Sequence, residues 1–151
     1  MSLRACRHLT SGEIELARSI FGDAIDYSKV RLFEGKWWPF HPRRAAMAPT
    51  GDIWFHPDGG GWSNDFSDEP LSQQGYFIHE MTHVWQAQKG GRLYLPLMRH
   101  PFCRYHYELK PGRPFRLYGI EQQAEIVRHR FLADRGAIVT TVPPLELLHF
   151  T

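Results

Sequence analysis

The residues most able to do chemistry lie in one five-residue segment, His79-Glu80-Met81-Thr82-His83. On an α-helix, a step of four residues returns a side chain to almost the same face, one turn further along. His79 and His83 can therefore reach one cation together, and imidazole nitrogen is a ligand that zinc favours. Glu80 follows the first histidine and can take a proton from metal-bound water. The spacing predicts a zinc-dependent hydrolase with Glu80 as general base.

A catalytic zinc site needs a third protein ligand if water is to hold the fourth position. A third histidine six residues after His83 is excluded, because Lys89 stands there. Glu121 and Glu125 lie one turn apart on another predicted helix, and we predict Glu121 as ligand. Glu125 would then accept a hydrogen bond from a ligand histidine and fix its tautomer. The reverse assignment of the two glutamates stays open, as does ligation by His100, His106 or Asp134.

Both groups of residues lie in segments whose apolar spacing predicts helices. The first is expected over residues 73–88, with Ser72 as N-cap and Gly90-Gly91 closing the C-terminus. The second is expected over residues 120–135, between two glycines, and Ala124 would let the helices approach closely. Their apolar faces are Phe77, Met81, Val84 and Trp85 in the first helix, and Ile120, Ala124, Val127 and Phe131 in the second.

The remaining sequence predicts shorter elements. Thr10 and Glu13 have the spacing of a capping box, which indicates a helix that stops at Gly22. Residues 57–72 are rich in glycine and small polar residues and predict a long loop, while the apolar tail 137–151 is expected to pack on the domain. Strands are expected at 29–33, 45–48, 52–56, 105–109 and 115–118.

Composition limits the class of protein. The 151 residues and 17.6 kDa suit one domain, residues 1–151, and 42% apolar with 23% charged residues is typical of a globular chain. A net charge of +2 gives no reason to expect nucleic acid or a membrane surface as partner. Two cysteines, Cys6 and Cys103, cannot make a disulfide framework, which favours a reducing compartment.

The N-terminal residues 1–8 have no apolar run that resembles a signal peptide, and no apolar stretch approaches the ~20 residues needed to span a bilayer. We therefore expect a cytoplasmic protein. Export by a route that needs no cleaved signal peptide is compatible with this sequence.

Residues 79–86 and 121–125 together resemble the gluzincin-type metallopeptidases. More narrowly, the chain is similar to small zincin-like proteins described as Vgr-related, found in bacteria near Rhs and Vgr-type secretion-spike genes. The resemblance implies an α+β, zincin-like fold. Its parts would be a small twisted, mostly antiparallel sheet whose edge strand lines the cleft, an active-site helix, and a second helix that bears a ligand. It also implies metal-dependent hydrolysis of peptide bonds.

A peptide or protein substrate would lie antiparallel to an edge strand, for which we choose residues 52–56. The developing oxyanion needs a further hydrogen-bond donor, and the sequence leaves five candidates open. These are Tyr105, Tyr107, Tyr118, His100 and His106. Aromatic residues near Gly and Pro could form a substrate surface or an interface, although in a small domain they are more often core. These are Trp37, Trp38, Phe40 and Trp62.

A different class of function also fits these residues. The chain could be a non-catalytic zincin-like binding module, docked to a secretion-spike protein and stabilised by zinc. The intact Glu80 favours the hydrolase, because a structural zinc site needs no base there. The small size favours the module, and hydrolysis of a non-peptide amide is a third interpretation.

Overall fold

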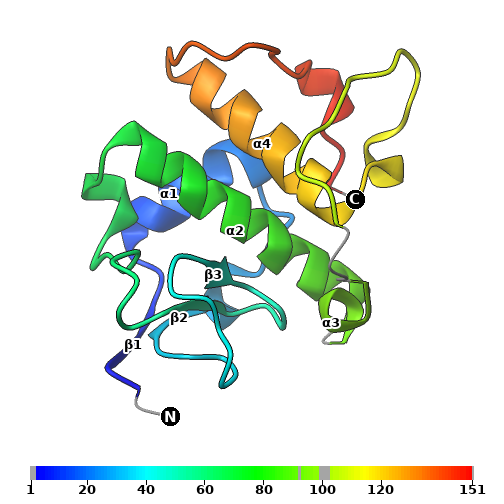
Figure 1. Cartoon of the computed structure of the whole chain (residues 1–151). Helices are drawn as coiled ribbons and strands as arrows, with labels where there is room; N and C mark the ends of the chain where they lie inside the picture. The colour runs from blue at the N-terminus through cyan, green and yellow to red at the C-terminus, as the bar shows by residue number, and fades with distance from the viewer. Residues whose placement is uncertain (1–2, 92, 99–102, 151) are drawn as a thin grey trace.

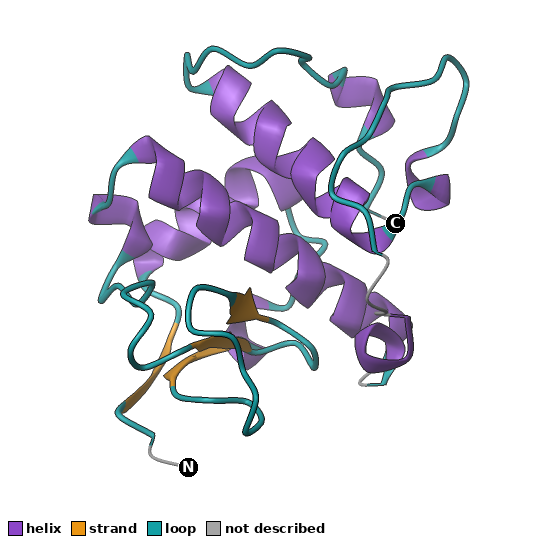
Figure 2. Ribbon diagram, in the orientation of Figure 1, coloured by secondary structure: helices purple, strands orange, loops and turns teal. Residues whose placement is uncertain are grey.

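The computed structural model describes residues 3–91, 93–98 and 103–150. The fold is α+β, with a small mixed sheet and four helices in this part of the chain (Figures 1 and 2). The strands are β1 Ala5–His8, β2 Arg31–Glu34, β3 Ala46–Met47 and β4 Ile53–Phe55. The helices are α1 Ser11–Phe21, α2 Leu71–Gly90, α3 Tyr94–Met98 and α4 Ile120–Asp134.

The four strands lie in the order β1-β2-β4-β3. The pairs β1/β2 and β3/β4 are antiparallel, whereas β2 and β4 are parallel, so the sheet is mixed. The strands expected at 29–33, 45–48 and 52–56 are confirmed, and β1 was not expected. Because β4 lies between β2 and β3, the prediction that residues 52–56 form the edge strand is wrong. The edge on that side is β3.

Helix α2 runs between the sheet and α4 (Figure 1). Every side chain from Phe77 to Ala87 is buried, so this stretch of the helix is enclosed on all sides. The prediction that only one face of the helix is buried was therefore too narrow. The predicted N-cap at Ser72 is wrong, because the helix begins at Leu71, directly after Pro70. The Pro70 carbonyl accepts hydrogen bonds from the backbone amides of Gln73 and Gln74. The buried polar residues of α2 must therefore find hydrogen-bond partners in the backbone, in neighbouring side chains or in a ligand.

The predicted features of α1 and α4 are confirmed. Thr10 and Glu13 make both hydrogen bonds of the capping box, and Gly22 ends α1. The apolar face of α4 is buried, with Ala124 fully enclosed. Gly75 of α2 lies against α4, because a Cβ there would stand 2.8 Å from a methyl carbon of Leu132. Close contact between these two helices is what places the glutamates of α4 beside the histidines of α2.

The segment before α4 differs from its prediction. Residues 103–118 contain no strand in the described structure; they form a loop with a short 3-10 turn at Phe115–Leu117 (Figure 2). Prolines in this segment have no backbone N–H to donate to a neighbouring strand. The backbone amide of Lys110 donates to the Tyr118 hydroxyl rather than to a strand. The apolar tail packs on the domain only near its end, where Phe150 contacts the rings of Phe21 and Trp85, while Ile138, Val142 and Leu145 are exposed. No described helix has the length and apolar character that crossing a bilayer requires.

Candidate metal centre

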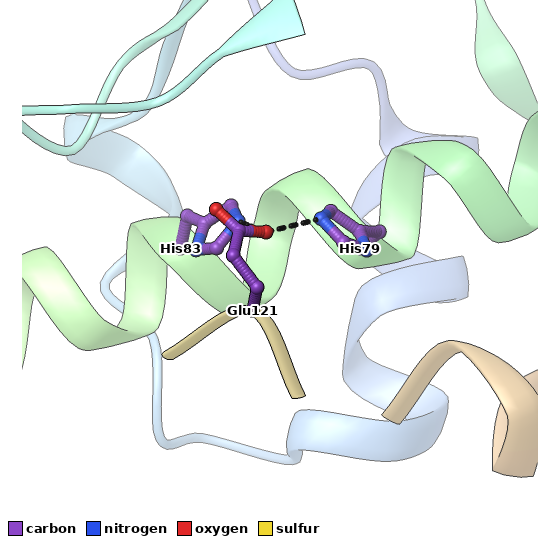
Figure 3. Close-up of side chains that lie close together, drawn as sticks. All are labelled: His79, His83 and Glu121. Atoms are coloured by element: carbon purple, nitrogen blue, oxygen red, sulfur yellow. Dashed lines mark hydrogen bonds and ion pairs between the residues drawn. The ribbon is translucent and has the colours of Figure 1, made fainter. Parts of the chain in front are cut away.

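Three buried side chains from two helices meet at one point. The Oε2 atom of Glu121 lies 3.2 Å from Nε2 of His79 and 3.1 Å from Nε2 of His83. Figure 3 shows the two imidazoles side by side on α2, with Glu121 reaching them from α4. The three potential ligand atoms all lie within 4.8 Å of one another. Two imidazole nitrogens and one carboxylate oxygen at this separation could hold a metal ion.

The start of α4 explains how Glu121 reaches this position. Gly119 donates its amide to the Gln122 side chain at 2.8 Å, which caps the first turn of the helix. Ile120 and Ala124 are buried in the core, so the first turn of α4 is held against α2. The Glu121 carboxylate then projects toward the histidines from a helix N-terminus, where a negative charge is favoured.

The charges of the cluster are strongly coupled in the metal-free protein. Burial alone would raise the pKa of Glu121, but hydrogen bonds with His79 and His83 hold that pKa well below its usual range. Burial alone would lower the pKa of His79, but Glu121 and Glu125 raise it to about 9. The two carboxylates therefore favour a positive charge at His79, which is the electrostatic setting a cation needs.

Glu80 has a feature expected of a residue that awaits a ligand. Its side chain is buried, and its Oε2 atom has no hydrogen-bond partner among the described residues. Glu80 lines a cavity of about 210 Å³ together with His79, His83 and Glu121. An unpartnered buried carboxylate oxygen is costly, so its place beside this cluster fits a site for a bound water or ligand.

Glu125 lies on the far side of the His79 ring. Its Oε2 atom is 3.7 Å from Nδ1 of His79, while Glu121 approaches Nε2 of the same ring. Arg128 and His129 also lie near this carboxylate, at 3.4 and 4.0 Å. One carboxylate thus lies at Nε2 of His79 and the other at Nδ1 of the same ring.

Gln86 holds the second histidine and was not among the site residues predicted from the sequence. Its Oε1 atom lies 2.8 Å from Nδ1 of His83, and its Nε2 donates to the Ile120 carbonyl and to Gln123. Because the Gln86 amide donates through nitrogen, its oxygen accepts, so Nδ1 of His83 carries the hydrogen. Nε2 of the same ring faces Glu121 and is the nitrogen that a metal ion would bind. A glutamine three residues after the second histidine was the available signal.

The cavity also includes residues that were not predicted. Tyr76, Arg44 and Arg128 line it, as does the edge strand β3 through Ala46. The Tyr76 hydroxyl accepts the Ala46 amide at 2.7 Å. Nothing in the sequence around Arg43-Arg44 indicated that Arg44 would reach the site.

The alternative residues named from the sequence lie in different places. Tyr105 lines the cavity and its ring stacks on His79, with centroids 6.1 Å apart. Tyr107 bonds His129, Tyr118 accepts from Lys110, and His106 lines a separate cavity. Asp134 pairs with Arg130 at the other end of α4. His100 lies outside the described residues.

Comparison with known proteins places the chain among secretion-system proteins. No family model matches it. It is 46% identical over 134 residues to the type VI secretion system spike protein VgrG2b of Pseudomonas aeruginosa, a match that covers 85% of this chain but 13% of that protein. A solved structure, the effector domain of Pseudomonas aeruginosa VgrG2b, matches with 43% identity and a TM-score of 0.76 over 88% of this chain and 77% of that one. This chain therefore belongs to the family of the VgrG2b effector domain, a Vgr-related group of secretion-system proteins.

Proposed function

We propose that this chain is a zinc-dependent hydrolase of peptide bonds that acts as an effector domain on a secretion spike. The names of its relatives support the association with a spike directly and state no activity. Hydrolysis is supported by one observation above all: a Glu80 carboxylate oxygen that has no partner in the described part of the chain and lies beside the buried cluster of His79, His83 and Glu121. We further propose a gluzincin-type, zincin-like fold, with α2 as active-site helix and α4 as ligand helix.

His79, His83 and Glu121 would hold the metal, and their two nitrogens and one oxygen suit zinc. When bound, zinc lowers the pKa of a coordinated water and polarises a carbonyl oxygen. The buried surroundings exclude bulk water and strengthen these electrostatic effects.

The residues of the chain then divide the remaining work. Glu80 takes a proton from the attacking water and passes it to the leaving amine, and its Oε2 atom, which has no partner among the described residues, is available for this task. Gln86 and Glu125 hold the two imidazole rings in orientation through their Nδ1 atoms. The substrate backbone would lie along β3, because Ala46 of this edge strand lines the cavity.

Tyr76 is a candidate to stabilise the oxyanion. Its pKa is raised to about 12, mainly by burial and also by Glu80, so the hydroxyl keeps its proton at neutral pH. Its oxygen already accepts from Ala46, which leaves the hydroxyl hydrogen available to a substrate oxygen in the cavity. Tyr105, which also lines the cavity, is the alternative donor.

A non-catalytic module on the spike is the second candidate. It agrees with the relatives' names as they stand, and a metal that joins α2 to α4 would stabilise the domain. Glu80 is the argument against it, because a buried carboxylate oxygen with no partner among the described residues lowers stability, and a purely structural module gains nothing in return for that cost.

Metal content combined with the Glu80→Gln variant tests the proposal. We expect this variant to keep one zinc per chain and to lose turnover of denatured protein, peptides or peptidoglycan-stem peptides. Glu15→Gln, an exposed glutamate of α1, is the matched control and should keep both properties. A wild-type protein that binds zinc and cleaves none of these substrates would favour the non-catalytic module.

A further inference from the structure

A second cavity opens beside the candidate metal centre and differs from the first in chemistry. It measures about 600 Å³, and its walls include Trp37, Trp38, Met47, Leu95 and Ile120. Its volume lies within the range of small-molecule and side-chain pockets, roughly 300–1,000 Å³. None of these five walls carries a charge. An apolar recess of this size on a small domain calls for an apolar occupant.

The apolar cavity and the polar cavity meet at the candidate metal centre. His83 and Glu121 line both of them. Edge strand β3 passes along both as well, since Ala46 lines the polar cavity and Met47 the apolar one. A chain lying along β3 with its reacting group at the histidines would therefore place one neighbouring side chain in the apolar cavity.

The loop that supplies the two tryptophans is fastened at its base. His41 is buried; its Nδ1 accepts the Trp37 amide at 3.2 Å, and its Nε2 donates to the Ala45 carbonyl at 2.7 Å. One imidazole thus closes the loop between Trp37 and Ala45. Trp38 nevertheless leaves 41% of its surface exposed. A loop that is closed by hydrogen bonds at its base and keeps an exposed indole beside a cavity is suited to bind a ligand.

We propose that the apolar cavity receives a large apolar side chain, aromatic or long aliphatic, of the peptide that is cut at the metal centre. This inference rests on the proposed function and adds the substrate class to it. The residue beside the cut would be selected by Trp37, Trp38 and Leu95, while the polar cavity, lined by Arg44 and Arg128, would receive the other side of the peptide.

Two metal-binding probes that differ only in their side chain test the cavity without any turnover. Phenylalanine hydroxamate and glycine hydroxamate would be titrated into the zinc-loaded Glu80→Gln protein. We expect the phenylalanine compound to bind about tenfold tighter or more, because burying a benzyl group is favourable. Trp38→Ser should remove most of this preference. Pro96→Asp, a second variant at an exposed position of the cavity wall, should weaken it through a charge.

Leu117→Ser is the control, since Leu117 is 55% exposed and lines neither cavity. Equal binding of the two probes, or a preference that both cavity variants leave unchanged, would overturn the proposal.

A peptide library cut by the wild-type protein separates the cavity proposal from the proposal of peptide hydrolysis. Cleavage without preference for a large apolar residue at a fixed position overturns the cavity proposal alone. A Trp38-dependent preference between the hydroxamates in a protein that cuts no peptide supports the cavity and overturns peptide hydrolysis. Binding of neither probe overturns the cavity proposal, and failure of the peptide library as well overturns both.

Discussion

The Oε2 atom of Glu121 lies 3.1 Å from Nε2 of His83, although the two residues belong to different helices. Helix α3 and the loop before α4 separate these helices in the chain. The contact joins the middle of α2 to the first turn of α4. It therefore makes the geometry of the candidate site depend on how these two helices pack, and on the side chains that fasten the first turn of α4 to α2.

The third ligand can be identified by comparing two alanine variants. Glu121→Ala should lose metal affinity by more than about a hundredfold, because it removes a donor atom, whereas Glu125→Ala should lose about 10–100-fold through the freed His79 ring. Competition with a chromogenic chelator measures both. If Glu125→Ala loses more affinity than Glu121→Ala, the assignment of the two glutamates must be exchanged.

Gln86 should have separable effects on metal affinity and on stability. Gln86→Glu keeps an acceptor for the Nδ1 hydrogen of His83 but loses the donor to the Ile120 carbonyl, so we expect nearly normal zinc affinity and lower stability. Gln86→Leu loses both contacts and should bind zinc about 10–100-fold more weakly. Each buried group left unpaired costs about 1–3 kcal/mol, which urea unfolding of the metal-free proteins would measure. Equal zinc affinities of the two variants would contradict a positioning role for Gln86.

Tyr76 and Tyr105 can be distinguished by removing one hydroxyl at a time. Tyr76→Phe should lower kcat by about 10²–10³ at unchanged zinc content, because an oxyanion donor acts in the transition state. Tyr105→Phe should have a smaller effect, since its ring contact with His79 is kept. Peptide turnover with zinc analysis checks both. A larger loss in Tyr105→Phe would assign the donor role to Tyr105.

Asp65 provides a stability test away from the metal. Burial would raise its pKa, but hydrogen bonds from Ser67 and Thr10 outweigh this and hold the pKa below its usual value. A lowered folded-state pKa gives stability that is present above the unfolded value near 3.8 and is lost as pH falls through the lower folded value. Asp65→Asn should therefore cost about 1 kcal/mol at pH 7 and less near pH 2, measured by thermal unfolding.

The control for this measurement is Asp23→Asn, because Asp23 is 93% exposed at the end of α1. Its stability should match that of the wild type across the same pH range. If Asp65→Asn destabilises equally at pH 7 and pH 2, the charge of Asp65 has no part in the effect.

The sequence by itself determined the elements whose signals are local. The four-residue spacing of His79 and His83, the capping box at Thr10 and the apolar stripe of α4 each lie within a few turns of helix, where backbone geometry alone sets which side chains share a face. The same local rules failed for residues 103–118, where extended-looking aromatic segments found no neighbouring strand to pair with.

Only the tertiary structure decided what lies around those histidines. It made β3 the edge strand rather than residues 52–56, brought Gln86 to the start of α4, and placed Arg44, Tyr76 and the paired cavities beside the cluster. Each of these relations joins side chains from different elements. Their distances follow from how helices and strands pack, which no spacing along the chain specifies.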